Sequence, residues 1–316
     1  MDSRQEMGSL WYQCKERYSQ AMASKLYEVE ELVDFYFHRR FAAVLAVMVS
    51  YCPLRIMPNH ITIGGLFLGW YSALCLYASH FPVSFFYLSP LTRYEAIMNA
   101  SFFMLAWIVS DCADGQVARL CQRGTRTGRI LDGLIDGAVV VPNLTVVSKI
   151  LEAIGYSSSL TIVSGFSLWF HTLTYDNMKN MYMEGVLPIS ECDGETPKSV
   201  YEEYKKASGL DAVLLRIYYH YLRLQTACQW TENRPTSRLS SKKERMEFAV
   251  KHAFTMRLAS FLGVSAHVVG FYISYFSFYY VGESALLALH FYFIVVLNAL
   301  GIYVVYLQKK MVEKKE

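Results

Sequence analysis

The chain has 316 residues, of which 53% are hydrophobic and 18% are charged, and its formal net charge is +3. This composition is too apolar for an ordinary soluble domain of this length and for a disordered chain. The small net charge gives a role in nucleic-acid binding no electrostatic support. Windows of about 18–25 mostly apolar residues instead predict an all-α integral membrane protein.

The chain begins with a polar segment and continues with a short apolar one. Residues 1–27 are polar and lack the apolar core of a signal peptide, so we expect them in the cytosol. Residues 28–57 contain an apolar core, 41–52, that is too short to cross a bilayer. We interpret 28–57 as an amphipathic interfacial helix with Arg39 and Arg40 facing lipid headgroups, with a tilted spanning helix as the alternative.

Six later segments are predicted to be transmembrane helices. Each is long and mostly apolar, and shorter polar or proline-containing connections separate most of them. The six expected spans are 61–81, 95–120, 128–150, 158–175, 250–280 and 284–307. Pro142 should kink the third span, and neighbouring helices must then satisfy the carbonyl that the proline leaves without its usual N–H partner.

A polar stretch, residues 178–249, interrupts the apolar pattern. Within it, Ser199 and Glu202 have the spacing of a helix capping box. The residues after Gly209 indicate an amphipathic helix that either lies on the membrane or packs on the helix bundle. Its expected apolar face consists of Leu210, Val213, Leu214, Ile217, Tyr221 and Leu224.

The distribution of basic residues predicts how the spans are oriented. The connections near 120–128 and 178–248 and the tail 309–316 carry nearly all the lysines and arginines outside the N-terminal region. The three remaining connections carry Arg93 alone. The positive-inside rule therefore predicts that both termini and the turn between the second and third spans are cytosolic.

The densest charge in the chain lies at that turn, in the sequence DCADGQVARLCQRGTRTGRILDGLIDG, residues 111–137. Four residues of the second span, at spacings of three, four and seven from the first of them, lie near one helix face. Three residues of the third span, at spacings of four and eight from the first, also share a face. These residues are Asp111, Asp114, Gly115 and Ala118 on the second span and Gly128, Asp132 and Asp136 on the third. Consecutive spans joined by a short turn are antiparallel neighbours, so the four carboxylates should converge.

Four carboxylates in one place need cations to neutralise them, and an all-oxygen ligand set suits Mg²⁺ or Mn²⁺. Small residues at three of the motif positions leave room for a substrate against the helix backbone. The surrounding arginines, which suit phosphate recognition and also fit the positive-inside rule, are Arg119, Arg123, Arg126 and Arg129. Carboxylate-held metals beside arginines at a membrane boundary suggest phosphoryl transfer to or from a lipid.

Two other interpretations of the aspartates compete with this one. Intramembrane carboxylates can form a cation path in a transporter, and small residues at these spacings can be packing faces alone. The other spans offer little further polar path, because their histidines, His171, His267 and His290, stand singly in the sequence. Such histidines are more often hydrogen-bonded core residues.

The motif Asp111-x2-Asp114-Gly115-x2-Ala118-Arg119-x8-Gly128-x3-Asp132-x3-Asp136 matches every fixed position of the CDP-alcohol phosphotransferase signature. The chain therefore resembles that family over about residues 30–180. The stretch Pro58-Asn59-x2-Thr62, the expected interfacial helix and the layout of a bundle of six transmembrane helices also resemble it.

The resemblance implies a transferase that cleaves a CDP-linked donor with two divalent metal ions, Mg²⁺ or Mn²⁺. It implies that Asp111, Asp114, Asp132 and Asp136 face the metals and that Asp136 is the candidate general base. The residues implied for the nucleotide and donor are Gly115, Ala118, Arg119, Gly128, Asn59 and Thr62. The candidates for phosphate or acceptor binding are Arg123, Arg126 and Arg129.

The pattern along the chain gives the domain plan, in which the long stretch between the fourth and fifth spans departs from the family's common pattern, and the resemblance leaves the substrates open. The catalytic transmembrane core would be 58–177, followed by the insertion 178–249, the last two spans within 250–308 and the basic tail. The leading interpretation is transfer of a phosphatidyl group from CDP-diacylglycerol to a small polar alcohol with release of CMP. The modest length and the six spans favour it over a CDP-choline-like donor with a diacylglycerol acceptor. Transfer between two soluble headgroups is a third variant, for which the arginines near the site could serve a phosphorylated acceptor.

Membrane lipids are expected partners. A second copy of the chain is another, because members of the family are often homodimers. The expected membrane is the endoplasmic reticulum in a eukaryote and the plasma membrane in a prokaryote. A non-enzymatic cation transporter remains the alternative from a different class.

Overall fold

The structure is a computed structural model that describes residues 3–23, 26–82, 92–188, 196–227 and 241–312. The described residues form helices and contain no strand. The N-terminal helices are α1 (Ser3–Met22), the short η1 (Tyr27–Val29), the π-helix η2 (Asp34–His38) and α2 (Arg39–Tyr51). The long helices that follow are α3 (Pro58–Ala78), α4 (Arg93–Leu120), α5 (Arg126–Ala153) and α6 (Ser159–Val186).

The second half of the chain is also helical. Its elements are α7 (Pro197–Tyr204), α8 (Gly209–Ala227), α9 (Lys242–Ala259), η5 (Ser260–Leu262), α10 (Val264–Val281), α11 (Ser284–Phe291), the π-helix η6 (Tyr292–Leu297) and α12 (Asn298–Val312).

The structure confirms the all-helical fold and contains several helices that suggest a multi-pass membrane protein, fewer than the six spans that the sequence predicts. Among the described residues, four helical segments are long and apolar enough to cross a bilayer: α3, α4, α5 and Ser284–Met311. A fifth is possible only as a pair, Lys242–Leu262 and Val264–Val281, which is bent by 45°. The expected span 158–175 lies in α6, which is absent from this set because serines, threonines and His171 interrupt its apolar residues.

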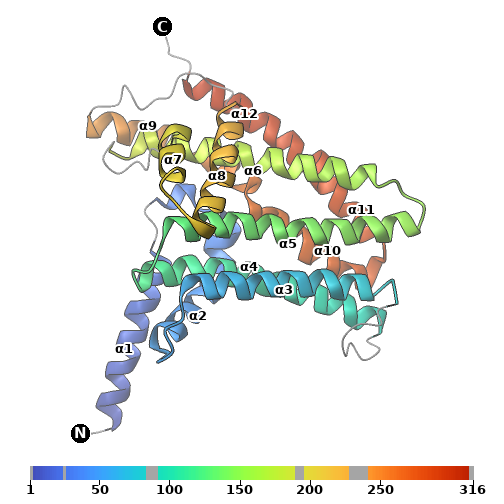
Figure 1. Ribbon diagram of the computed structural model, residues 1–316, viewed down its shortest axis with the longest axis horizontal. Helices are drawn as coiled ribbons and strands as arrows, with labels where there is room; N and C mark the ends of the chain where they lie inside the picture. The colour runs from blue at the N-terminus through green and yellow to red at the C-terminus, as the bar shows by residue number, and fades with distance from the viewer. Residues whose placement is uncertain (1–2, 24–25, 83–91, 189–195, 228–240, 313–316) are drawn as a thin grey trace. The chain divides into compact units, whose positions relative to one another are not determined.

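The chain divides into two compact units. The first contains Met1–Lys25, Val33–Tyr156 and Phe271–Leu286. In this unit α3 packs along both α4 and α5, and Figure 1 shows the three helices lying side by side. Gly69 of α3 allows this approach, because a Cβ there would collide with the side chain of Val139 on α5. The motif helices α4 and α5 are thus both positioned against α3.

The predicted effect of Pro142 on its neighbours is visible at this contact. Pro142 has no N–H for the carbonyl of Ala138, and the indole N–H of Trp70 on α3 donates to that oxygen instead, at 2.8 Å. The amide of Asn143 donates to the carbonyl of Gly69 at 3.1 Å and its oxygen accepts from Tyr275 at 3.2 Å. The indole bond satisfies the carbonyl that Pro142 leaves without its helix partner, and the Asn143 bonds join α5 to its neighbours while α5 continues through Pro142.

The predicted orientation of Arg39 is wrong. Its side chain is only 5% exposed, and its guanidinium donates to the carbonyls of Met22 at 3.4 Å and Ala23 at 3.3 Å. The backbone carbonyl of Arg39 in turn accepts from the buried amide of Gln116 on α4 at 3.0 Å. Arg39 therefore joins the N-terminal segment to the motif helix and does not face lipid headgroups. The structure does not establish an interfacial helix over 28–57.

The second unit contains Leu26–Leu32, Ser157–Gly270 and Leu287–Glu316. Helix α6 packs against α9 and α12, and Gly185 makes room for the ring of Phe248. His171 bonds to the ring of His267 at 3.0 Å and to the amide oxygen of Asn298 at 3.1 Å. The buried histidines that stand singly in the sequence are thus hydrogen-bonded core residues in the fold.

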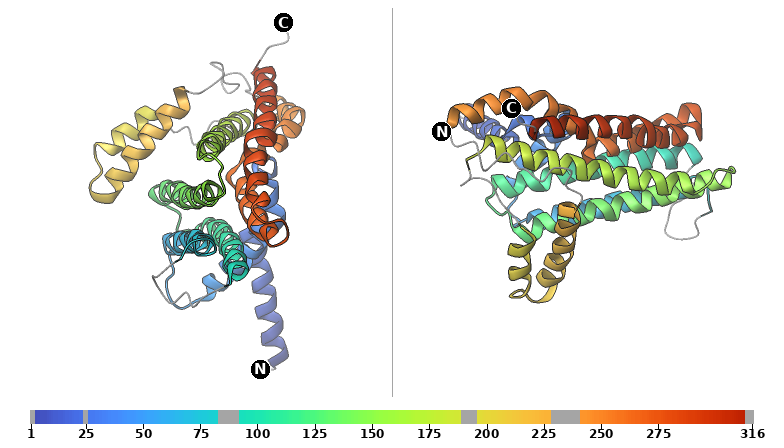
Figure 2. Two further views of the ribbon diagram at one scale, coloured as in Figure 1. Left: turned by 90° about the vertical axis from the view of Figure 1, so that its right-hand side faces the viewer. Right: turned by 90° about the horizontal axis from the view of Figure 1, so that it is seen from above.

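Helices α7 and α8 form a hairpin in this unit (Figures 1 and 2). The capping residue of α7 differs from the prediction, because Thr196 accepts from the backbone N–H of Ser199 at 3.2 Å. Pro197 occupies the first turn, where the missing N–H has no cost. Helix α8 is tied to α6 by the hydroxyl of Tyr221, which donates to the carboxylate of Asp176 at 2.7 Å.

Candidate active site

A tight turn brings the two motif helices together. Helix α4 ends at Leu120 and α5 begins at Arg126, and Gln122 between them has φ of 52°, in the left-handed region. The hydroxyl of Thr125 accepts from the backbone N–H of Gly128 at 3.0 Å and caps α5. The predicted antiparallel reversal therefore occurs between the two halves of the motif.

The carboxylates converge as the spacing predicts. One carboxylate oxygen from each of Asp111, Asp114 and Asp132 lies within 4.8 Å of the others. Asp114 is buried, with 5% of its surface exposed, and the other two are partly buried. The charge of Asp136 acts on Asp111, so the fourth aspartate belongs to the same electrostatic cluster.

Asp114 is held by α3. The hydroxyl of Thr62 donates to Asp114 Oδ2 at 2.5 Å, and Thr62 is itself 5% exposed. A single hydrogen bond to a buried carboxylate fixes its rotamer but leaves its negative charge uncompensated. The family resemblance implied that Thr62 belongs to the donor pocket, and the structure brings its hydroxyl into direct contact with Asp114.

Two oxygens of the cluster indicate a cation. Asp132 Oδ1 and Asp136 Oδ1 are buried and have no hydrogen-bond partner among the described residues. Buried carboxylate oxygens normally accept hydrogen bonds or bind a metal. The donors are all carboxylate oxygens, the ligand type that Mg²⁺ and Mn²⁺ prefer. The cluster of Asp111, Asp114 and Asp132 can therefore hold a divalent ion.

The small motif residues differ in what surrounds them. A Cβ on Gly128 would lie 2.9 Å from Asn59 Oδ1 and equally close to Thr125 Oγ1, so Asn59 of α3 lies directly over this glycine. A Cβ on Gly115 would have only the guanidinium of Arg119 within 4 Å among the described atoms, at 3.6 Å. A side chain at position 128 would therefore force Asn59 or Thr125 to shift, whereas the backbone at Gly115 has room for a ligand.

The four arginines occupy different positions around the turn. Arg119 is exposed near the end of α4, and Arg126 and Arg129 belong to the first turns of α5. Arg123, in the turn itself, donates to the carbonyl of Ile56 at 3.1 Å and so ties the turn to the segment before α3. Arg123 therefore has a structural contact that the sequence did not predict.

Sequence reasoning missed Asp34 and Gln116. The charge of Asp34 acts on both Asp111 and Asp136, and its carboxylate pairs with His38 at 2.7 Å. Gln116 anchors the N-terminal segment to α4 two residues after Asp114. Two features of the sequence could have indicated these residues. Asp34 and His38 are an acid and a base four residues apart, and Gln116 is a polar amide inside an apolar span.

The fold and the cluster together define a helical membrane protein whose membrane-crossing helices hold a carboxylate site of the kind that binds divalent cations. A family model, CDP-alcohol phosphatidyltransferase, matches residues 55–225, which include α3 to α7, nearly all of α8 and the whole motif. The chain belongs to this family. Membership makes it a transferase that acts on a CDP-linked donor. No curated protein and no solved structure matches the chain.

Proposed function

We propose that the protein transfers a phosphatidyl group from CDP-diacylglycerol to the hydroxyl of a small polar alcohol and releases CMP. The observation that carries the proposal is the convergence of the motif carboxylates from α4 and α5 in a family of CDP-alcohol transferases. The apolar helices that carry the site favour a donor with lipid chains. The length of the chain, 316 residues, also favours this donor over a CDP-amino-alcohol.

The proposed cofactors are two divalent ions, Mg²⁺ or Mn²⁺. Asp111, Asp114 and Asp132 are the proposed ligands, and the unpartnered oxygen of Asp136 faces the same cluster. When bound, such ions would neutralise the donor's pyrophosphate and the charge that develops on the leaving CMP. Thr62 would hold Asp114 in the geometry for binding.

The donor and acceptor would be positioned by the residues around the cluster. We assign the nucleotide to the backbone near Gly115 and Ala118, where a ligand can approach closely. Arg119, whose guanidinium lies over Gly115, would contact the donor phosphates. Asn59 and Gly128 would form the wall of the pocket on the α3 side. Arg126 and Arg129 remain the candidates for a phosphate on the acceptor.

The reaction we propose is a substitution at the phosphorus that carries diacylglycerol. The alcohol oxygen forms a new bond to this phosphorus, the bond from phosphorus to the CMP oxygen breaks, and CMP leaves with the bonding electrons. The proton of the alcohol passes to the carboxylate of Asp136 late in the attack. Asp136 is suited to this role because one of its oxygens is buried and makes no hydrogen bond to a described residue.

We further propose that the site and both termini face the cytosol. The basic residues of the α4–α5 turn and of the chain's end support this orientation. Six crossings would require that α6 also spans the bilayer, and its packing along α12 supports that arrangement. The core would then be 58–177, with 178–249 as a cytosolic insertion.

The test is release of CMP by the purified protein in detergent with Mn²⁺ and CDP-diacylglycerol. Inositol, serine, glycerol 3-phosphate and inositol phosphate are supplied one at a time. We expect CMP release that depends on one of these alcohols. Release only from CDP-choline or CDP-ethanolamine with diacylglycerol would contradict the proposed donor, and no release from any pair would contradict transferase activity.

A further inference from the structure

The outer face of α8 is apolar although the helix is already anchored. Its buried side, which includes Leu214 and Leu222, faces the rest of the unit, and α7 packs against it. A second set of large apolar side chains points outward at helical spacing. The exposed fractions are 68% for Leu210, 54% for Val213, 42% for Ile217 and 46% for Leu224. We call these four residues the α8 stripe.

The α8 stripe has basic residues beside it. Arg216 and Arg223 are exposed and lie next to the stripe around the helix. The hairpin 197–227 as a whole has five lysines and arginines against three acidic residues. An apolar stripe flanked by cations is the pattern of a helix that lies in the headgroup region of a bilayer.

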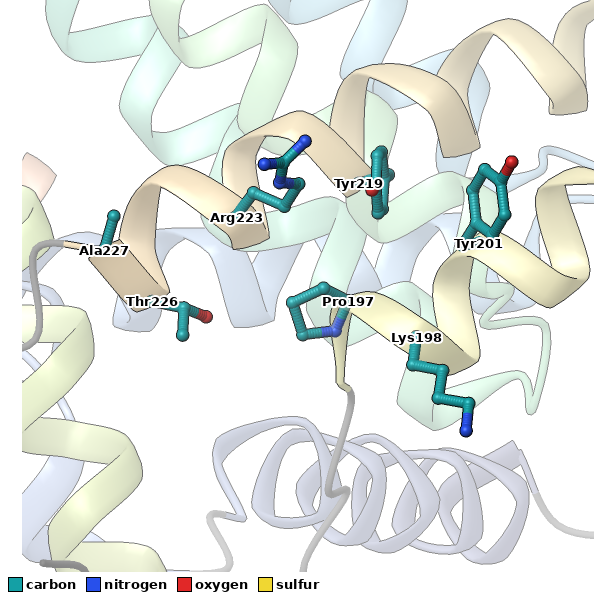
Figure 3. Close-up of a pocket in the computed structure, with 7 residues that line it drawn as sticks. All are labelled: Pro197, Lys198, Tyr201, Tyr219, Arg223, Thr226 and Ala227. Atoms are coloured by element: carbon teal, nitrogen blue, oxygen red, sulfur yellow. The ribbon is translucent and has the colours of Figure 1, made fainter. Parts of the chain in front are cut away.

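A cavity between α7 and α8 adds to the basic side of the hairpin. Its volume is about 550 Å³, and Lys198 and Arg223 line it together with Tyr201 and Tyr219 (Figure 3). The two tyrosine rings are 5.3 Å apart, and the guanidinium carbon of Arg223 lies 5.8 Å from the ring of Tyr219. Figure 3 shows the charged groups of Lys198 and Arg223 pointing away from each other, so the cavity adds basic residues to the hairpin and is not itself assigned a headgroup.

The anchoring point of α8 lies where α6 changes character. Residues 159–175 of α6 contain no acidic residue, lysine or arginine, and Asp176 is the first charged residue after them. Tyr221 of α8 bonds to that residue. If α6 spans the bilayer beside the apolar segment Ser284–Met311, as proposed above, the end of its uncharged run would lie at a membrane boundary.

We propose that the α7–α8 hairpin docks on the surface of the surrounding bilayer, with the α8 stripe among the acyl chains and Arg216 and Arg223 on anionic phospholipid headgroups. The hairpin would thereby hold α6 near Asp176 at the membrane surface. The proposal concerns lipid binding by the second unit and does not depend on which substrates the site in the first unit uses.

The experiment is hydrogen–deuterium exchange of the full-length protein in lipid nanodiscs, followed on peptides from α8. One disc contains phosphatidylcholine alone and the other also contains phosphatidylglycerol. We expect slower amide exchange in α8 in the anionic disc and reversal of that slowing by high salt. Each arginine at an anionic surface strengthens the equilibrium constant for docking by about fivefold. The double variant Arg216→Gln with Arg223→Gln should therefore lose most of the difference in α8 exchange between the two discs.

The matched control is Lys242→Gln with Lys243→Gln, which removes the same charge from exposed positions on α9. This variant should keep the protection of α8. The proposal is overturned if α8 exchanges equally in both discs or if the double arginine variant remains fully protected. Protection that increases with protein concentration in detergent would instead show that a second copy of the chain covers the stripe.

Discussion

The hydroxyl of Thr62 donates a 2.5 Å hydrogen bond to the carboxylate of Asp114, and both residues are buried. This bond connects the second turn of α3 to the motif on α4. It makes α3 part of the site, although the motif aspartates all lie on the two helices that follow. Removal of the bond should therefore affect the chemistry more than the fold.

Thr62→Val keeps the shape of the side chain and removes its hydrogen bond. We expect CMP release to fall by about tenfold, the effect of one hydrogen bond to a charged group, and the Mn²⁺ concentration for half-maximal rate to rise. Initial rates across a Mn²⁺ titration measure both effects. Thr145→Val, at an exposed position on α5, is the control and should behave like the parent protein. An unchanged Mn²⁺ dependence in Thr62→Val would argue against a positioning role.

Gly128→Ala should disturb the contact between α3 and α5. Its new methyl group would lie 2.9 Å from Asn59 Oδ1, so Asn59 or the helix must shift. We expect a cost of about 1–3 kcal/mol in stability, together with weaker donor binding. Gly133→Ala is the control, because a Cβ there has no described atom within 4 Å, and better helix propensity should stabilise it by up to about 1 kcal/mol. Thermal unfolding in detergent compares the two, and equal midpoints would refute this account.

The bond from Trp70 to Ala138 predicts a rescue. Trp70→Phe leaves the carbonyl of Ala138 without a partner and should cost about 1 kcal/mol. Pro142→Ala restores an N–H that can reach this carbonyl, so the double variant should recover the loss. The measurement is a double-mutant cycle on thermal stability. Additive losses in the two substitutions would show that the indole does not replace the missing helix bond.

Stability should depend on the charge state of His80. Burial, with the nearby guanidinium of Arg93, lowers the pKa of His80 from its ordinary value of 6.5 to about 4. The neutral ring accepts from Arg93 at 2.7 Å, and Arg93 also pairs with Glu283. Because the folded-state pKa is the lower one, this stabilisation is complete above pH 6.5 and is lost as the pH falls toward about 4.

The comparison is thermal unfolding of the parent protein and of His80→Gln across that range of pH. The difference in unfolding temperature between the parent and His80→Gln should shrink steadily as the pH falls. The control His220→Gln, at an exposed position on α8, should have the same dependence of unfolding temperature on pH as the parent. A constant difference between the parent and His80→Gln would show that the ring does not titrate in this way.

The sequence predicted the convergence of the carboxylates better than it predicted the number of membrane spans. Helix periodicity was sufficient to bring Asp111, Asp114 and Asp132 together, because carboxylates at fixed spacings on two antiparallel helices can converge in few ways. The role of Arg39 was not predictable, since a basic residue beside an apolar run is as compatible with headgroups as with buried carbonyls. The sixth span remains a prediction because hydroxyl-rich helices such as α6 satisfy their side chains internally, as Thr174 does with the carbonyl of Phe170.

The central claim is that the converging carboxylates bind divalent cations and thereby support CMP release. The most direct measurement is Mn²⁺-dependent CMP release by Asp111→Asn and Asp132→Asn, each purified and checked for a folded helical spectrum. Asp136→Asn is assayed beside them for donor binding. The account predicts folded variants without CMP release, and donor binding that survives better in Asp136→Asn than in Asp111→Asn. Near-normal CMP release by either folded metal-ligand variant would contradict it.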